Sequence, residues 1–185
     1  MNDNSISLHL ALKEPSIEKK KNVLKQLIAI GANLNERNEH CETPLHVAIS
    51  KGLEDIAAEL IPKMPMKMLN SCCGFGLTPL YLAVEKNQLK TAKLLLKNGA
   101  NVNLISFVGN WHRVTSLQLA FQINNHEMIN LLLKYEPEVG RFEALEVLKL
   151  PLEWVVKEDF RNVFKMMCKS EIPRNILVRM LCLSL

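Results

Sequence analysis

The phrase Thr43-Pro44-Leu45-His46-Val47-Ala48 constrains the fold of this chain most strongly, because it returns at nearly regular intervals. Related phrases begin at Thr78, at Thr115 and, in a more divergent form, at Leu150, which gives intervals of 35, 37 and 35 residues. A period of roughly 20 to 50 residues is typical of solenoids and other repeat arrays. The chain is therefore predicted to be a periodic array of similar units.

Each phrase also predicts how a unit folds. Thr43 can cap a helix that Pro44 opens, since its hydroxyl accepts an otherwise unpaired backbone N–H and proline fits the first helical turn. The small Ala48 leaves room for a neighbouring helix. A more apolar second helix follows in the best-preserved unit at 89–96, and Gly99 just beyond it is a helix-stop signal. One helix pair cannot bury its apolar face alone, so successive pairs must stack.

A second phrase keeps the same period. Gly31-Ala32-Asn33-Leu34-Asn35 and Gly99-Ala100-Asn101-Val102-Asn103 lie 68 residues apart, which is twice 34. Together the two phrases resemble those of the ankyrin-repeat family, whose units contain Thr-Pro-Leu-His-x-Ala and Gly-Ala-Asp-Val-Asn. The resemblance covers about residues 6–175 and implies an all-α solenoid of stacked helix pairs with short turn or hairpin fingers. It predicts a single domain over residues 1–185, with units at approximately 6–37, 38–72, 73–109, 110–144 and 145–175 and a C-terminal segment at 172–185.

Two stretches depart from the repeat. Pro62 must end or distort the second helix of its unit, because it lacks an N–H. The methionines that follow, at 64, 66 and 68, either fill an irregular gap or form an adaptable binding surface. The stretch 104–114 holds about four inserted residues, and it is either a recognition element or a flap packed on its own repeat.

The finger turns are also expected to differ. Gly76 stands where the family carries a turn glycine, two residues before the Thr-Pro-Leu phrase. Cys41 and Arg113 occupy that place in the neighbouring units, which predicts less tight turns there.

In the ankyrin family, partners commonly bind the concave side, which is formed by the finger tips and the exposed face of each first helix. Carried over by position, the resemblance implies ten partner-binding residues: His40, Glu42, Phe75, Leu77, Glu85, Lys86, Trp111, His112, Val114 and Ile123. The aromatic members are typical of binding hot spots. Alternatively, Phe75 and Trp111 pack against each other and only stiffen the fingers.

No residue pattern indicates catalysis or a metal site. His46 is interpreted as a hydrogen-bonding framework residue, because Tyr81 and Gln118 take its place in the next units. No Gly-rich phosphate loop, nucleophile elbow or His-Glu-x-x-His sequence is present. The five cysteines form no Cys-x-x-Cys pair and their number is odd, which favours reduced thiols in a cytosolic or nuclear compartment. We therefore expect no enzymatic activity, no cofactor and no metal.

Composition limits the classes of partner. Of 185 residues, 48% are hydrophobic and 23% are charged, as in a folded domain, and the net charge of +4 does not by itself indicate nucleic acid. No signal peptide is evident, and no apolar stretch approaches the roughly 20 residues that span a bilayer. The expected location is the cytoplasm, with the nucleus, or a host cytosol for a viral or intracellular bacterial protein, as alternatives.

Two functional hypotheses follow. The first is a non-enzymatic protein-binding adaptor or inhibitor, and the resemblance to IκB-type inhibitors implies a Rel-type transcription factor as partner. The second is a substrate-receptor adaptor for a ubiquitin ligase, because residues 172–185 are similar to the opening of an F-box-like or SOCS-box-like segment. The same segment can instead be a helix that closes the stack.

Overall fold

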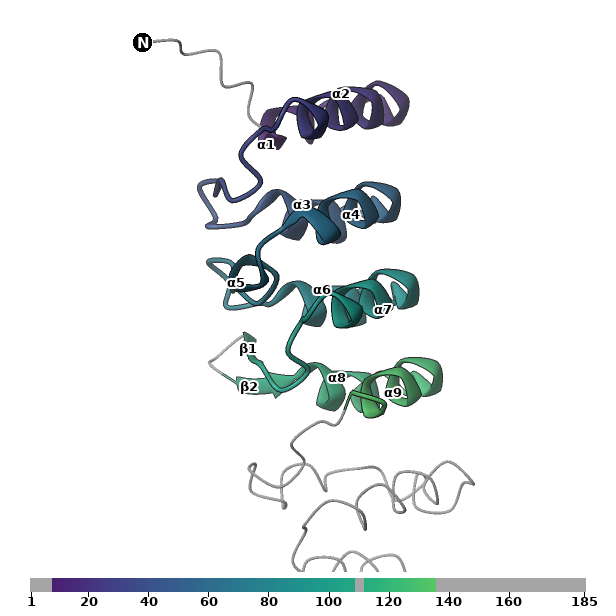
Figure 1. Cartoon of the computed structure of the whole chain (residues 1–185). Helices are drawn as coiled ribbons and strands as arrows, with labels where there is room; N and C mark the ends of the chain where they lie inside the picture. The colour runs from purple at the N-terminus through teal and green to yellow at the C-terminus, as the bar shows by residue number, and fades with distance from the viewer. Residues whose placement is uncertain (1–7, 109–111, 136–185) are drawn as a thin grey trace, which may run out of the picture. The chain divides into compact units, whose positions relative to one another are not determined.

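The first part of the chain is a stack of helix pairs (Figure 1). The computed structural model describes residues 8–108 and 112–135. Its contacts divide the chain into two compact units, residues 1–116 and 117–185. The pairs of the first unit are α1 (Leu8–Ala11) with α2 (Ile17–Ala29), α3 (Pro44–Ser50) with α4 (Glu54–Leu60), and α6 (Pro79–Glu85) with α7 (Leu89–Lys97). The predicted all-α repeat fold is confirmed.

The first helices of the second and third pairs begin at the predicted caps. Thr43 Oγ1 accepts a hydrogen bond from the N–H of His46 at 3.4 Å, and Thr78 Oγ1 accepts one from the N–H of Tyr81 at 3.2 Å. A proline occupies the first turn of each helix, where its missing N–H costs no hydrogen bond. The repeated phrase therefore sets where these helices start.

The helices of the first unit form two layers. Neighbouring first helices contact one another, α1 with α3 and α3 with α6, and the second helices α2, α4 and α7 do the same. Ala48 and Ala83 are fully buried, as expected for small residues where helices approach closely. Because helices of seven residues are too short to be stable alone, stacking of the pairs must hold them.

Between α4 and α6 the chain departs from the pair pattern, as Pro62 predicts. Pro62 lies in a short 3-10 helix, η1 (Ile61–Lys63), which is followed by α5 (Met66–Leu69). The methionines of this insert play different roles. Met64 is buried and fills space, whereas 64% of the Met66 surface is exposed.

The inserted stretch before the fourth helix pair is a hairpin. β1 (Ile105–Val108) pairs with β2 (His112–Thr115) in antiparallel register, with Ser106 opposite Val114 and Phe107 opposite Arg113. Successive side chains of a strand face opposite sides, and Ser106 is accordingly buried while Phe107 is 40% exposed.

The expectation of a less tight turn at Cys41 is wrong. Cys41 has a left-handed φ of 55° and Gly76 has a φ of 75°. The N–H of Cys41 donates to Asn38 O and that of Gly76 donates to Cys73 O, both at 2.9 Å. A cysteine thus adopts the conformation that the family assigns to glycine, whereas Arg113 lies in strand β2.

Two helices are described for the second unit: α8 (Ser116–Gln122), which starts at the boundary between the units, and α9 (His126–Leu133). Asn125 caps α9, since its Oδ1 accepts the N–H of Met128 at 3.0 Å. Met128 and Leu132, one turn apart, are both fully buried. The predicted unit at 145–175 and the segment at 172–185 lie outside the described residues.

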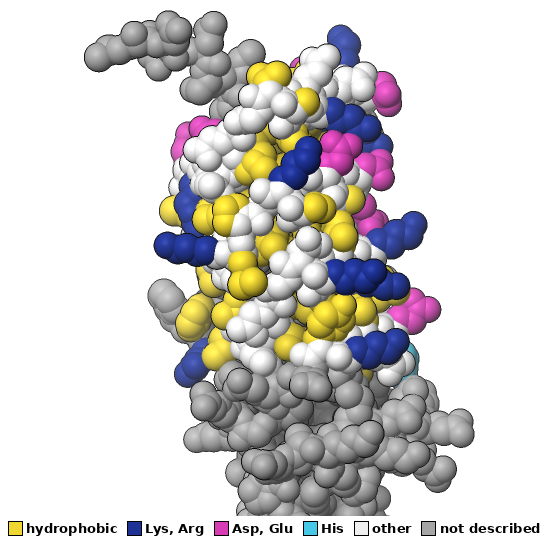
Figure 2. Space-filling view, viewed as in Figure 1, with side chains coloured by type: hydrophobic (Ala, Val, Ile, Leu, Met, Phe, Trp, Pro, Cys, Tyr) yellow, Lys and Arg dark blue, Asp and Glu magenta, His cyan; other side chains and the backbone are white. Residues whose placement is uncertain are grey.

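The surface of the described part mixes apolar and charged groups. Figure 2 shows hydrophobic patches between Lys and Arg side chains on the face in view. Isolated exposed apolar residues are normal in proteins, but a group of them in one place indicates binding.

Candidate protein-interaction surface

The fingers of the first unit are joined into a row by backbone hydrogen bonds. The finger row consists of residues 38–42, residues 73–77 and the β1–β2 hairpin. The N–H of Gly74 donates to His40 O at 2.7 Å, and the N–H of Phe107 donates to Gly76 O at 3.0 Å. Each finger of the row is therefore joined directly to the next.

Two glycines allow the fingers to come this close. A Cβ on Gly74 would lie 2.6 Å from the carbonyl oxygen of His40, and one on Gly76 would lie 2.8 Å from the Cβ of Phe107. Both distances are shorter than side chains tolerate, so larger residues would push the fingers apart. Arg37 adds a clamp, because its Nη1 donates to Cys41 O at 2.6 Å and to Cys72 O at 2.9 Å.

Aromatic side chains line the tips of the row. The ring centroids of His40 and Phe75 lie 5.6 Å apart with the planes tilted by 33°. Phe107 lies beside Gly76, the next residue after Phe75. The exposed fraction is 61% for Phe75 and 40% for Phe107. We call His40, Phe75 and Phe107 the finger ridge.

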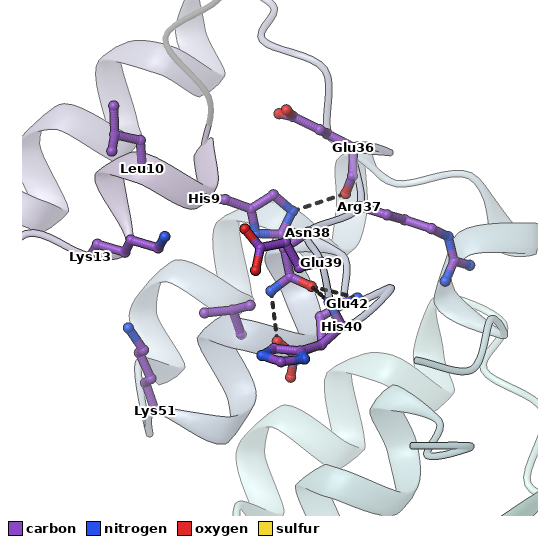
Figure 3. Close-up of a pocket in the computed structure, with 11 residues that line it drawn as sticks. His9, Leu10, Lys13, Glu36, Arg37, Asn38, Glu39, His40, Glu42 and Lys51 are labelled. Carbon is purple, nitrogen blue, oxygen red and sulfur yellow. Dashed lines mark hydrogen bonds between the residues drawn. The ribbon is translucent and has the colours of Figure 1, made fainter. Parts of the chain in front are cut away.

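A groove runs between the first finger and the first helices, with a volume of about 500 Å³. Figure 3 shows Lys13 and Lys51 on the helix side and Glu39 with His40 on the finger side. Lys51 Nζ is held by Leu12 O at 2.9 Å. Within the described residues, Lys13 Nζ and the Glu39 carboxylate have no ion-pair or hydrogen-bond partner, so the groove offers charges of both signs to a ligand.

The structure brings together some of the predicted site residues. Phe75 and His40 both belong to the finger ridge. Glu42 is half-buried, and its Oε2 accepts a hydrogen bond from Asn38 Nδ2 at 2.7 Å. Leu77 and Val114 are half-buried at the bases of their fingers. Glu85 and Lys86 lie exposed at the end of α6 and pair with each other at 3.3 Å.

Other predicted site residues are not placed with them. Trp111 lies outside the described residues, so its role in partner binding and the alternative that it packs against Phe75 both stay predictions. His112 is described only through its backbone in β2. Ile123 belongs to the second unit and is 43% exposed there.

Sequence reasoning missed Phe107 and the groove. Phe107 falls in the inserted stretch 104–114, where the alternation Ile105-Ser106-Phe107 signals a strand with one exposed face. The groove depends on α1, which supplies His9 and Leu10 to its lining, with Lys13 just beyond its end. The charged residues Lys13 and Glu36 give no sequence pattern that would separate them from an ordinary solvated surface.

His46 is a framework residue, as predicted, and stands apart from this surface. Its Nδ1 accepts the N–H of Thr43 at 3.2 Å, and its Nε2–H donates to Ser71 O at 3.1 Å. Burial lowers the pKa of His46 to about 4, so the neutral form carries these bonds. In the next unit Tyr81 takes its place, and Ser106 Oγ accepts the N–H of Thr78 at 3.2 Å instead.

The described residues offer little for other chemistry. Burial raises the pKa of the Cys72 thiol, which disfavours the reactive thiolate. Within residues 8–108 and 112–135, no group of three potential ligands could hold a metal ion. No helix in that part of the chain is both long enough and apolar enough to cross a membrane.

Comparison with known proteins agrees with the stacked pairs and their capped first helices. The family profile for ankyrin repeats, in three copies, matches residues 8–106, which is just over half of the chain. The chain belongs to the ankyrin-repeat family. Ankyrin repeats are protein–protein interaction modules and are generally not enzymes, and this coarse function fits the finger row and groove.

Three relatives show how widely these repeats occur. The transient receptor potential cation channel subfamily A member 1 of Homo sapiens is 34% identical over 49% of this chain and 8% of its own length. The nuclear factor NF-kappa-B p105 subunit of Gallus gallus is 33% identical over 52% of this chain and 10% of its own length. The putative ankyrin repeat protein FPV232 of Fowlpox virus is 30% identical over 81% of this chain and 30% of its own length. The chain thus spans about a tenth of the first two relatives and under a third of the viral one. Because these relatives are so different, the similarity lies in the repeats and does not by itself identify a partner.

Proposed function

We propose that this protein is a non-enzymatic adaptor or inhibitor that holds a protein partner against the finger ridge and the adjoining groove. The observation that carries the proposal is the exposure of Phe75 and Phe107, at 61% and 40%, on fingers that backbone hydrogen bonds hold in place. Aromatic residues on a fixed scaffold bind with a small loss of conformational entropy, and they are enriched among binding hot spots.

The groove extends this surface and gives it polar specificity. His40 belongs to the ridge and also lines the groove, so the two are continuous. A partner segment that passes from the ridge into the groove would meet Glu39 on one wall and Lys13 on the other. Opposite charges at fixed positions set the orientation of a ligand more than they add to its affinity.

A Rel-type transcription factor is the first partner to test. The similarity to the NF-kappa-B p105 subunit, over about half of this chain, supports this choice. It is a proposal about the partner only, since the same repeats occur in a cation channel. The cytoplasm is the proposed compartment for the interaction.

The test compares the full chain with Phe75→Ala/Phe107→Ala in affinity capture from cytosolic lysate and in direct binding to a purified Rel homology region. The matched control is Val23→Ala/Ile30→Ala, which shortens two other exposed apolar side chains. Val23 lies in α2 and is 37% exposed, and Ile30 directly follows α2 and is 79% exposed. We expect the ridge variant to lose binding roughly tenfold or more and the control to bind like the unaltered chain. Equal binding by the ridge variant and the unaltered chain would exclude the ridge as the partner-binding site. Binding of other proteins but no Rel homology region would remove only the choice of partner.

The ubiquitin-ligase hypothesis concerns residues 172–185, which lie outside the described residues. A variant that ends at Glu171 belongs in the same experiment. If ligase subunits are captured by the full chain and lost on this truncation, the segment docks to the ligase and the repeats hold its substrate. If the captured proteins do not change, the segment has no part in binding.

A further inference from the structure

The positive charge of the chain is concentrated in one stretch. Residues 1–59 hold seven Lys and Arg against nine Asp and Glu, a net of 7 − 9 = −2, and residues 127–185 hold nine of each, a net of zero. Residues 60–126 hold seven Lys and Arg against Glu85 alone, a net of 7 − 1 = +6. The sum, −2 + 6 + 0, reproduces the overall +4. The modest total therefore conceals a strongly basic stretch.

Part of this charge lies on and next to the insert between α4 and α6, which also carries an exposed apolar side chain. Lys63 ends η1, Lys67 lies in α5, and Lys97 ends α7. All three are exposed, and Met66, between the first two in sequence, is 64% exposed. Met66 reaches the end of α7, because its Cε would lie 3.1 Å from a Cβ on Gly99. We call Lys63, Lys67, Lys97 and Met66 the basic platform.

The platform is fixed to the next repeat. Asn70 Nδ2 donates to Met66 O at 3.1 Å and to Gly99 O at 3.0 Å, and Asn70 Oδ1 accepts the N–H of Asn101 at 2.7 Å. A single amide thus joins α5 to the turn that follows α7. Met66 is held in an exposed position by this clamp.

The platform lysines also differ from Lys21 and Lys25 of α2. Lys21 pairs with Asp55 and Lys25 with Glu59 across neighbouring repeats. Within the described residues, none of the three platform lysines has an ion-pair partner. On the face in Figure 2, acidic side chains likewise gather toward α1–α4, and basic ones prevail below them in the first unit.

We propose that the basic platform docks an acidic protein segment that places an apolar side chain on Met66. Charge complementarity selects the partner, because three exposed lysines without an ion-pair partner in the described part of the chain lie within a few residues of Met66 or of Gly99, which Met66 approaches. A nucleic acid fits less well, since the platform has no arginine and no aromatic side chain for stacking. A membrane surface would require a broader apolar face than one methionine. The platform shares no residue with the ridge or the groove, so the proposal stands independently of the proposed function.

The test selects random 12-residue peptides, displayed on phage, for binding to the full chain. Phage that also bind the Lys67→Glu/Lys97→Glu variant are removed, so that peptides specific to the platform remain. We expect the peptides that remain to carry several Asp or Glu around an apolar residue. Fluorescence anisotropy of one such peptide at 0.15 M salt should then show at least a tenfold loss of affinity for the double variant, and a smaller loss for Met66→Ser.

The matched control is Lys19→Glu/Lys134→Glu, which makes the same change in net charge at exposed lysines elsewhere. Charges beyond about 8 Å are largely screened at this salt concentration, so the control should bind within about twofold of the unaltered chain. Phe75→Ala/Phe107→Ala should also bind normally, which separates this surface from the ridge. Equal losses in both charge variants, enrichment of non-acidic peptides, or tighter binding to phosphatidylserine vesicles or single-stranded DNA than to the selected peptide would overturn the proposal.

Discussion

At the scale of single residues, the backbone conformation of Cys41 introduces strain that lowers the stability of the fold and that the sequence does not reveal. Its φ of 55° lies in the left-handed region, which disfavours residues with a Cβ by roughly 1–2 kcal/mol. Its side chain is exposed, so little packing would be lost on its removal.

Cys41→Gly should therefore stabilise the fold. Relief of the left-handed strain outweighs the extra chain entropy of glycine, roughly 0.5–1 kcal/mol, and leaves a net gain of about 0.5–1 kcal/mol. Urea unfolding of the two proteins measures the gain as a higher midpoint. A lower midpoint for the glycine variant would show that the thiol makes an interaction that outweighs the strain.

His46 should make stability depend on pH. Burial puts its folded-state pKa at about 4, below the ordinary 6.5 of the unfolded chain, so protonation favours unfolding. The stabilisation that neutral His46 gives to the folded state is fully present above pH 6.5 and is lost as the pH falls toward 4. The loss in the free energy of unfolding amounts to up to about 3 kcal/mol. The free energy of unfolding of the unaltered chain should fall more steeply between these pH values than that of His46→Gln. Parallel curves would mean that another group dominates, since the carboxylates are common to both proteins.

At the scale of elements, the finger row depends on two separable effects at Gly76. One is its positive φ of 75°, and the other is the approach of Phe107, whose Cβ would lie 2.8 Å from an added Cβ. Gly52 has a similar φ of 71° but nothing within 4 Å of an added Cβ. The two glycines therefore form a matched pair.

Gly52→Ala should lower the free energy of unfolding by roughly 1 kcal/mol through backbone strain alone. Gly76→Ala should lower it by about 1–2 kcal/mol more, because the added Cβ clashes with the neighbouring finger. Hydrogen exchange of the Phe107 amide, which donates to Gly76 O, should accelerate in Gly76→Ala and not in Gly52→Ala. If both variants lower the free energy of unfolding equally and exchange of the Phe107 amide does not change, the fingers can move apart without destabilising the fold.

At the scale of the whole molecule, the features that repeat could be predicted and those that occur once could not. Thr43 and Thr78 hold the same place in successive units, as do the buried Ala48 and Ala83, so their roles could be inferred from spacing. Phe107 lies in an insertion where the side-chain period changes from 3.6 to 2, and no other unit within the described residues repeats this strand. The groove and the basic platform each combine residues far apart in sequence, such as Lys13 with Glu39 or Met66 with Lys97. Contacts of this kind follow from stacking geometry, which a periodic sequence sets only approximately.

A stack in which each pair contacts only its neighbours should transmit a defect along its length. Ala83 of α6 is fully buried in the layer that includes α3, and Ala83→Leu should destabilise the fold by about 2–3 kcal/mol through overpacking. Ala58 of α4 is exposed, so Ala58→Leu is a matched control that should change stability little. Hydrogen exchange followed by mass spectrometry should show faster exchange in α3 and α4 as well as in α6 and α7 for Ala83→Leu only, because α3 loses its packed neighbour. Faster exchange confined to α6 and α7 would mean that the pairs are stable on their own, although their short helices argue that each requires its neighbours.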